Sequence, residues 1–225
     1  MMYACRTLLP DVTFETRPLR YTQPNTLIDI ICEEEGLGTD GVARDNLFRA
    51  LRHLIQFDGG GYLDMEFCIK DTHAIVMSGL PMMESGPGQF SPHERFTYMG
   101  GGETHNYPHK LDWDPTMLTL VDRYNNFVAD NNNNISRLDF TEIAKILGWF
   151  AYTMISYHPF GDGNGRLCRL IIGYLSSRLI HEHFFCSLGP KDYLIEALVK
   201  DRTINNDSSI ETTKLLYQTN TIPKK

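Results

Sequence analysis

The chain has 225 residues, of which 42% are hydrophobic and 22% are charged, and its net charge is −7. These values are ordinary for a globular protein that buries a core as one domain, or as one domain with a small helical appendage. The acidic balance argues against nucleic acid and anionic membranes as partners, because either would favour a basic surface.

The cysteines and apolar runs indicate the compartment. The five cysteines are scattered and form no Cys-x-x-Cys pair, which favours free thiols in a reducing environment. No apolar run is long enough to resemble a signal peptide or to span a bilayer. We therefore expect a cytoplasmic protein.

In the first half of the chain, segments with helical spacing of apolar residues are separated by segments that contain proline or glycine. Three prolines in residues 1–24 predict extended or irregular structure. Apolar spacing then predicts a short helix capped by Asn25 or Thr26, and a second helix from about Asp40 to the glycine run at 59–61. Residues 64–79 repeat this spacing and predict another helix.

The second half predicts one hairpin and more helices. Residues 95–108 alternate briefly and then turn on glycines, which is typical of a β-hairpin. Asp114 is expected to cap a helix that Pro115 begins, and Asp139 to begin the next one. Further helices are predicted at 191–200, where Tyr193, Leu194, Ala197 and Leu198 share a face, and around 210–217. The fold class is therefore all-α with a small hairpin.

One stretch organises the chain, His158 to Arg169, with the sequence HPFGDGNGRLCR. Helical spacing on both sides predicts helix, tight turn, helix. Pro159 ends the first helix, and the glycines permit backbone conformations that a Cβ would obstruct. A glycine-rich turn that opens into a helix N-terminus directs N–H groups and the positive end of the helix dipole at one spot. The pattern therefore predicts an anion site.

The polar side chains of this stretch suit phosphoryl chemistry. Arg166 and Arg169 share a helix face and could hold successive phosphates. Asp162 is a hard oxygen ligand suited to Mg²⁺, and Asn164 can hydrogen-bond a phosphate. His158 titrates near neutrality and could take a proton from an attacking hydroxyl. An ordinary turn would not explain why a base, an acid and two arginines share one loop, so we favour a phosphoryl or nucleotidyl transfer site.

The same stretch resembles the signature of the Fic (filamentation induced by cAMP) domain family, His-x-Phe-x-Asp/Glu-Gly-Asn-Gly-Arg-x-x-Arg, at every defined position. The resemblance implies an all-helical fold and, usually, transfer of AMP from ATP to a protein hydroxyl. It also implies that His158 is the general base, that Asp162 holds Mg²⁺ and that Phe160 anchors the loop. The implied phosphate-binding residues are Gly163, Asn164, Gly165, Arg166 and Arg169.

Two further parts of the family pattern concern the target protein. The family has a β-hairpin flap that pairs with the target's backbone, and residues 95–108 would be that flap, with Thr97, Tyr98 and Met99 binding the target. An ordinary surface hairpin is the alternative. The family's usual connection to the flap ends in Gly-x-Phe/Tyr-Arg, whereas here Ser91 stands in place of the arginine.

The family also offers a possible inhibitory residue. Many members carry a helix with the pattern Ser/Thr-x-x-x-Glu-Gly/Asn, whose glutamate pairs with the second motif arginine. The nearest match here is residues 31–36, with Ile31 in the hydroxyl position and Glu35 as the glutamate. Glu35 is thus a possible restraint on ATP binding, and a solvated helix end is the alternative.

The sequence therefore predicts an N-terminal extension (1–62) with a possible regulatory helix, a catalytic core (63–200) and a C-terminal helix and tail (201–225). The expected activity is transfer of AMP from Mg-ATP to a Ser, Thr or Tyr hydroxyl of a target protein, with Mg²⁺ and ATP as cofactor and co-substrate. Transfer of phosphate, UMP or phosphocholine by the same motif is one alternative. A nucleotide-binding or interaction module without turnover is the other.

Overall fold

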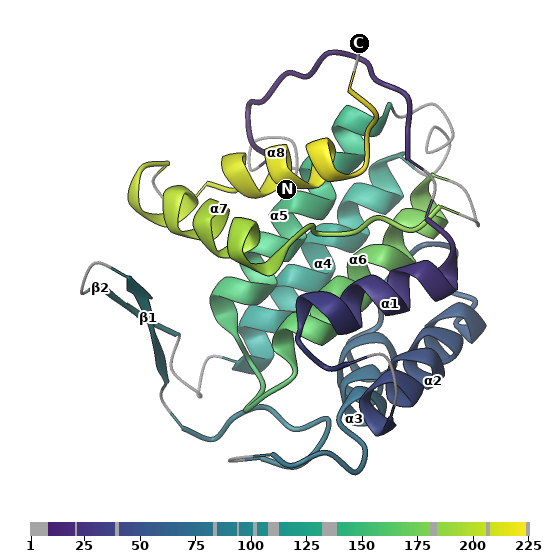
Figure 1. Ribbon diagram of the computed structural model, residues 1–225, viewed down its shortest axis with the longest axis vertical. Helices are drawn as coiled ribbons and strands as arrows, with labels where there is room; N and C mark the ends of the chain where they lie inside the picture. Colours follow the sequence, from purple (N-terminus) through teal and green to yellow (C-terminus); the bar gives the residue numbers. More distant parts are fainter. Residues whose placement is uncertain are drawn as a thin grey trace.

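The computed structural model describes residues 9–20, 22–38, 41–82, 85–93, 95–100, 103–107, 113–131, 139–180, 184–205 and 208–223. Helices make up the regular structure of these residues, apart from one two-stranded antiparallel sheet and two isolated bridges (Figure 1). The all-α class with a small hairpin is therefore confirmed.

In chain order the elements are α1 (Pro24–Glu34), α2 (Val42–Gln56), η1 (Met65–Asp71), α3 (Thr72–Val76), β1 (Phe96–Gly100), β2 (Glu103–Asn106), α4 (Trp113–Asn131), α5 (Phe140–Tyr157), α6 (Asn164–Leu179), α7 (Lys191–Thr203) and α8 (Ile210–Thr219).

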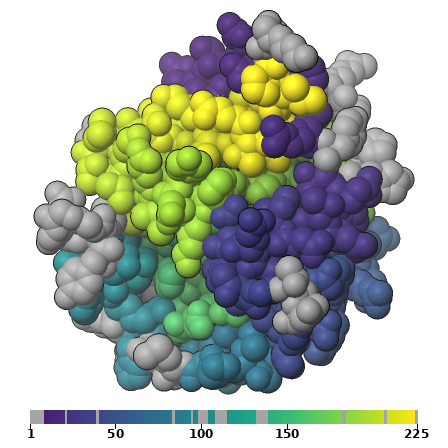
Figure 2. All heavy atoms as spheres, viewed as in Figure 1, coloured from purple at the N-terminus to yellow at the C-terminus, as the bar shows by residue number. Residues whose placement is uncertain are grey.

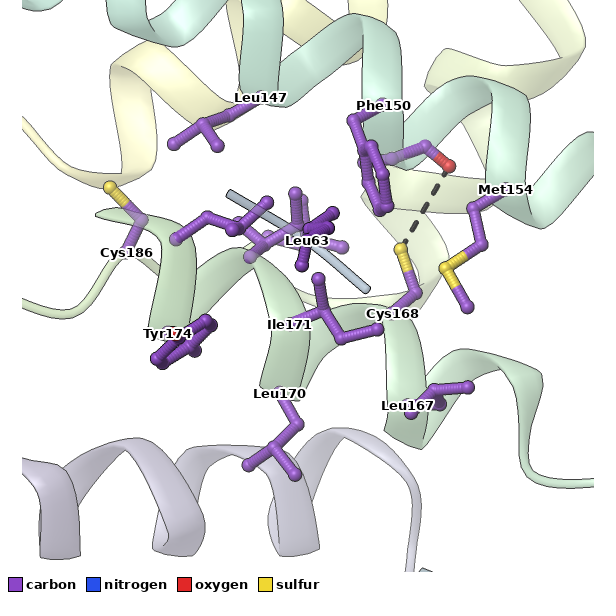
Figure 3. Packing of buried hydrophobic residues seen from close by; sticks show 14 of the residues in the cluster. Leu63, Leu147, Phe150, Met154, Leu167, Cys168, Leu170, Ile171, Tyr174 and Cys186 are labelled. Atoms are coloured by element: carbon purple, nitrogen blue, oxygen red, sulfur yellow. Dashed lines mark hydrogen bonds between the residues drawn. The ribbon is translucent and has the colours of Figure 1, made fainter. Parts of the chain in front are cut away.

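The helices α5 and α6 form the centre of the molecule. They pack against each other, while α4 and α8 contact α5 and the N-terminal helices α1, α2 and α3 contact α6. Figure 3 shows Phe150 and Met154 of α5 facing Cys168 of α6, whose thiol donates to the Ala151 carbonyl oxygen at 3.9 Å. Because α6 is buried along almost its whole length, the loop that joins it to α5 is supported by the core on both sides.

The N-terminal segment and the C-terminal helix lie side by side. Leu19 bridges to Thr221, and the Arg20 N–H donates to the Asn220 carbonyl oxygen at 2.8 Å. Residues 9–20 contain no helix, as their prolines predict. One hydrophobic cluster includes residues from α1 through α8, so the N-terminal and C-terminal parts share the core of the central helices.

Two helix starts differ from the prediction. α1 begins at Pro24 itself, with Gln23 as its N-cap, because proline lacks the N–H that the first turn cannot use. α4 begins at Trp113, so Asp114 lies inside the helix rather than at its cap. The start of α5 is confirmed, since the Asp139 carboxylate accepts the Glu142 N–H at 3.0 Å.

Two other expectations need correction. The predicted helix at 64–79 winds as a π-helix over η1 and as an α-helix only over α3, and its Asp64 cap accepts the Phe67 N–H at 2.7 Å. Tyr193, which helical spacing places on the buried face of α7, is 60% exposed. Leu194, Ala197 and Leu198 are buried as predicted, so Tyr193 is the one residue of this set that does not share the buried face.

Four cysteines, Cys32, Cys68, Cys168 and Cys186, are buried free thiols. Within the ranges given above, none of the helices has the length and apolar character needed to cross a membrane.

Candidate active site

The loop between α5 and α6 is closed by the side chain of Asn164. Its Oδ1 accepts the Phe160 N–H at 3.0 Å, and its Nδ2 donates to the Phe160 carbonyl oxygen at 2.7 Å. Phe160 is fully buried, as expected for an anchor. Both groups of the amide therefore hold the loop, while Nδ2 carries a second N–H that these bonds do not use. The bond from Asn164 to a phosphate stays a prediction.

A buried histidine supports the loop from beneath. The Gly88 N–H donates to His73 Nδ1 at 2.9 Å, so Nε2 carries the proton and donates to the Asp162 carbonyl oxygen at 2.8 Å. The imidazole also stacks on the Phe160 ring, with centroids 3.8 Å apart. Burial lowers the pKa of His73 to about 4, and the ring is therefore neutral near pH 7.

An arginine holds the loop from the side of the hairpin. Arg95 donates to the carbonyl oxygens of Gly161, at 3.1 Å, and of His158. Ser91, in the position where the family has arginine, contacts the loop through its backbone, since its N–H donates to the Pro159 oxygen at 2.8 Å. The arginine that contacts the loop therefore stands four positions later in this chain.

His158 itself ends α5 in a left-handed conformation (φ 51°), unusual for a residue with a side chain, with its N–H bonded to the Met154 oxygen at 3.0 Å. Its imidazole stacks on Tyr107, with centroids 4.5 Å apart. Burial, followed by the positive charge of Arg95, lowers the pKa of His158 to about 4. The imidazole is thus neutral near pH 7, the state in which it can accept a proton.

At the other end of the loop, Asp162 lies beside the start of α6. Its Oδ1 accepts the Gly163 N–H at 2.5 Å and pairs with Arg166 at 3.2 Å. The Asp162 side chain is 51% exposed. Mg²⁺ in nucleotide sites takes one or two carboxylates and completes its shell with phosphates and water, which this exposed carboxylate fits. Among the residues that the structure describes, no three His, Cys, Asp or Glu side chains form an all-protein metal cage.

Arg169 and Glu35 form a buried ion pair across the first turn of α6. Arg169 Nε lies 3.1 Å from Glu35 Oε1, and the two side chains are 2% and 15% exposed. Arg169 Nη1 donates to the Gly189 oxygen at 2.7 Å, while the buried Nη2 has no hydrogen-bond partner in the described part of the chain. A Cβ on Gly165 would lie 2.8 Å from Glu35 Oε1, so the carboxylate sits directly over the start of α6, where the sequence predicts an anion.

Glu35, Tyr107, His158, Asp162, Asn164 and Arg169 all line one cavity of about 320 Å³. One wall is α7, which contributes Leu194, Ile195, Leu198 and Val199, with Lys191 and Arg202 at its two ends. Figure 2 shows α7, in yellow-green, meeting the purple surface of α1, which carries Glu35 at its end. The cavity thus has a charged floor at the motif and an apolar wall at α7.

The hairpin borders the cavity on a further side. β1 and β2 pair antiparallel from Phe96↔Asn106 onward, with an irregularity between Tyr98 and Gly100. Thr97 lines the cavity, and His105 Nε2 lies 3.1 Å from the Ser156 oxygen near the end of α5. The side chains of Tyr98 and Met99 lie outside the described residues.

The structure brings most of the predicted site residues to this one cavity. The predicted residues that line it are Glu35, Thr97, His158, Asp162, Gly163, Asn164, Gly165, Arg166 and Arg169. Sequence reasoning assigned no site role to His73, Arg95, Tyr107 or the α7 wall. His73 lies within the helix expected at 64–79, and Arg95 and Tyr107 lie within the hairpin expected at 95–108, but nothing in the chain order indicates that they meet the loop.

Comparison with known proteins agrees with this geometry. The model of the Fic/DOC family matches residues 62–176, more than half of the chain. The curated ribonucleoside-diphosphate reductase small chain of Ostreid herpesvirus 1 (isolate France) is 28% identical over 166 residues. That match covers 72% of this chain but spans only 28% of the length of the viral protein.

Solved structures share the fold. A Fic family protein from Desulfovibrio desulfuricans G20 has a TM-score of 0.58 at 16% identity, over 87% of this chain and 61% of that one. The BepC protein of Bartonella tribocorum, a VirB-translocated effector with bound AMPPNP, has a TM-score of 0.57 at 14% identity, over 98% of both chains.

Proposed function

The chain belongs to the Fic/DOC family, and we propose that it transfers AMP from Mg-ATP to a hydroxyl of a target protein. The observation that carries the proposal is the cavity itself, which has a neutral imidazole at one end of the loop and two arginines with a helix N-terminus at the other. The fold shared with BepC, which binds AMPPNP, supports ATP as the nucleotide.

The phosphates would lie at the start of α6. Successive phosphates would find two kinds of donor there: the free backbone N–H groups of the first helical turn, and the guanidinium groups of Arg166 and Arg169. Asp162 would hold Mg²⁺, which when bound neutralises phosphate charge. The salt bridge from Asp162 keeps Arg166 beside the same carboxylate, so the two groups would act on one part of the polyphosphate.

His158 would act on the target rather than on the nucleotide. Its neutral imidazole takes the proton of a Ser, Thr or Tyr hydroxyl, and the oxygen attacks the α-phosphorus in line. The bond from the α-phosphorus to the bridging oxygen breaks, and pyrophosphate leaves with that oxygen. Such transfers depend mainly on positioning and on charge stabilisation, both of which the loop provides.

The α7 wall would receive the nucleoside. Its four apolar side chains have no hydrogen-bonding groups, so adenine would be held there by packing. The same wall would accept another base, so UMP transfer stays an alternative. Transfer of phosphate or phosphocholine also stays one, because none of the described residues of the site fixes the orientation of the ligand. Thr97, Tyr98 and Met99 of the hairpin would bind the target's backbone.

Glu35 would restrain this activity. Its carboxylate lies on Arg169 and over Gly165, in the place where we propose the outer phosphate. Ile31 of α1, which replaces the family's hydroxyl residue, is 1% exposed and packs in the hydrophobic core of the protein instead. The restraint would therefore depend on the ion pair and on packing of α1.

The test is incubation of the protein with labelled ATP and Mg²⁺ in a lysate, with intact-mass measurement of the modified proteins. We expect a mass gain of one AMP on a target and its loss in His158→Ala, with ATP affinity by calorimetry unchanged. Removing a general base costs roughly 10²–10⁴-fold in rate. A gain of a different mass would show that the transferred group is not AMP. ATP binding without modification of any protein would favour the non-catalytic module.

A further inference from the structure

The orientation of His158 has an unusual basis. A functional histidine is generally oriented by a hydrogen bond at the ring nitrogen that does not react. Here Nδ1 of His158 is buried and makes no hydrogen bond of normal geometry within the residues that the structure describes, although the backbone oxygen of Ile155 lies near the imidazole. A contact between rings can add to this backbone contact in fixing the plane of the imidazole.

That contact is the ring of Tyr107. The two rings stack with centroids 4.5 Å apart and planes inclined by 21°, and both line the cavity. Offset stacking of aromatic rings is worth about 0.5–1.5 kcal/mol beyond the burial of their surfaces, and it fixes the plane of each ring.

Tyr107 is itself held by the stem of the hairpin, meaning the residues at its open end, Arg95 and Phe96 on one side and His105 to Tyr107 on the other. Its N–H donates to the Arg95 carbonyl oxygen at 2.9 Å, next to the Phe96↔Asn106 pair of the sheet. The Arg95 guanidinium lies 5.8 Å from the centre of the Tyr107 ring and donates to the His158 carbonyl oxygen. His105 packs edge-on against the same ring, with centroids 5.1 Å apart. The hairpin stem thus contacts both the backbone and the ring of His158.

We propose that Tyr107 is a positioning residue for His158: its ring, held at the hairpin stem with Arg95, sets the plane of the imidazole that accepts the target's proton. This inference rests on the proposed function for its catalytic consequence, though not for the ring geometry. The proposal gives the hairpin two roles, since the segment that would bind the target also orients the imidazole that would deprotonate it.

Kinetics with matched variants test the catalytic part. Tyr107→Phe keeps the ring and loses only the phenol, which bonds to Thr97, so its kcat should stay well above that of Tyr107→Leu. Tyr107→Leu keeps an apolar side chain but removes the stack, and should lower kcat by up to about 10²-fold, the cost of a small misplacement of a catalytic group. KM for ATP should stay the same in both. Equal kcat in Tyr107→Leu and the wild type would overturn the proposal.

A second measurement does not depend on activity. The imidazole proton resonance of His158, assigned by its loss in His158→Ala, should shift in Tyr107→Leu as the ring current disappears, and should stay in place in Tyr107→Phe. An unmoved resonance in Tyr107→Leu would overturn the proposal even if the wild type transfers no group. Should Tyr107→Leu fail to fold, a nuclear Overhauser contact between the Tyr107 and His158 rings of the wild type decides, and its absence would also overturn it.

Discussion

At the scale of single residues, two ion pairs of different burial lie at the end of the cavity where we propose the phosphates. The Arg166–Asp162 pair is partly open to the cavity, whereas the Arg169–Glu35 pair is nearly closed. Breaking a buried pair by removing one partner leaves the other charge uncompensated. The two arginines should therefore respond differently to nucleotide, since only Arg169 must exchange a protein carboxylate for a phosphate.

We expect Asp162→Ala and Arg169→Ala to weaken binding of Mg-ATP, because each removes a charged contact worth roughly 1.5–3 kcal/mol. For Arg169 the loss should be larger in a Glu35→Gln background, where the guanidinium is available to the nucleotide. Calorimetry on the single and double variants measures both effects. Arg52→Ala, an exposed arginine of α2, is the control. Equal ATP affinity in the wild type and in both variants would contradict the proposed phosphate site.

At the scale of elements, the end of α1 holds two other helices in place. Glu35 lies over the start of α6. Lys191 is the first residue of α7, and its backbone N–H donates to Glu34 Oε2 at 2.5 Å. Glu33 is exposed. Three successive glutamates therefore have three different environments, and substitution of each tests a different contact.

Glu35→Gln should raise target modification by about tenfold, because a neutral amide competes less well with phosphate for Arg169. Glu33→Gln should not change it, and it is the matched control on the same turn. The rate of AMP incorporation measures both. If the two variants match the wild type, Glu35 stabilises the structure without restraining the enzyme.

The junction between α7 and α8 depends on one buried carboxylate. Asp201 is fully buried and accepts hydrogen bonds from the backbone N–H groups of Glu211 and Thr212, at 2.7 and 2.8 Å, and from the Thr212 hydroxyl. It thus caps α8 from a neighbouring helix.

Asp201→Asn should lower the free energy of unfolding by roughly 2 kcal/mol, because a charged acceptor of two N–H groups becomes an amide with a donor facing them. Urea unfolding measures the change. Asp139→Asn is the control, since asparagine caps the exposed start of α5 as well as aspartate does. An equal effect of both changes would show that Asp201 is no more than an ordinary cap.

At the scale of the whole molecule, the buried His73 and the partly buried His158 make stability depend on pH. His73 and His158 both have pKa values lowered to about 4 from an ordinary value of 6.5. Between these two values the unfolded chain binds more protons than the folded one, so the free energy of unfolding decreases as pH falls through this window. A protonated His73 would also lose the acceptor that Gly88 uses.

We expect His73 alone to account for up to roughly 3 kcal/mol of this loss between pH 7 and pH 4, at 1.36 kcal/mol per unit of pKa change. His73→Gln removes the titrating group, so its free energy of unfolding should be lower than that of the wild type at pH 7 but less dependent on pH. Urea unfolding at pH 7, 6 and 5 compares the two slopes. Parallel slopes would contradict the buried, neutral state of His73.

Several features of the molecule could be predicted from the chain alone because they depend on local order. The spacing of apolar residues decides which face of a helix is buried, and the order of proline, glycine and asparagine decides where α5 ends and α6 begins. Residues 158–169 are adjacent in the chain, so helix geometry alone brings His158, Asp162, Arg166 and Arg169 to one loop. The contact between Glu35 and Arg169 was within reach only through resemblance to a family pattern.

Tertiary structure decided the contacts that no local rule encodes. His73 meets Asp162 across 89 residues, and Arg95 and Tyr107 meet His158 across about fifty or more. The use of Asn164 within the loop likewise follows from how the loop folds back on Phe160. The sequence gives only the order of the residues, whereas packing of one shared core determines which residues that are distant in the chain come into contact. The residues that support His158 are brought together by such packing.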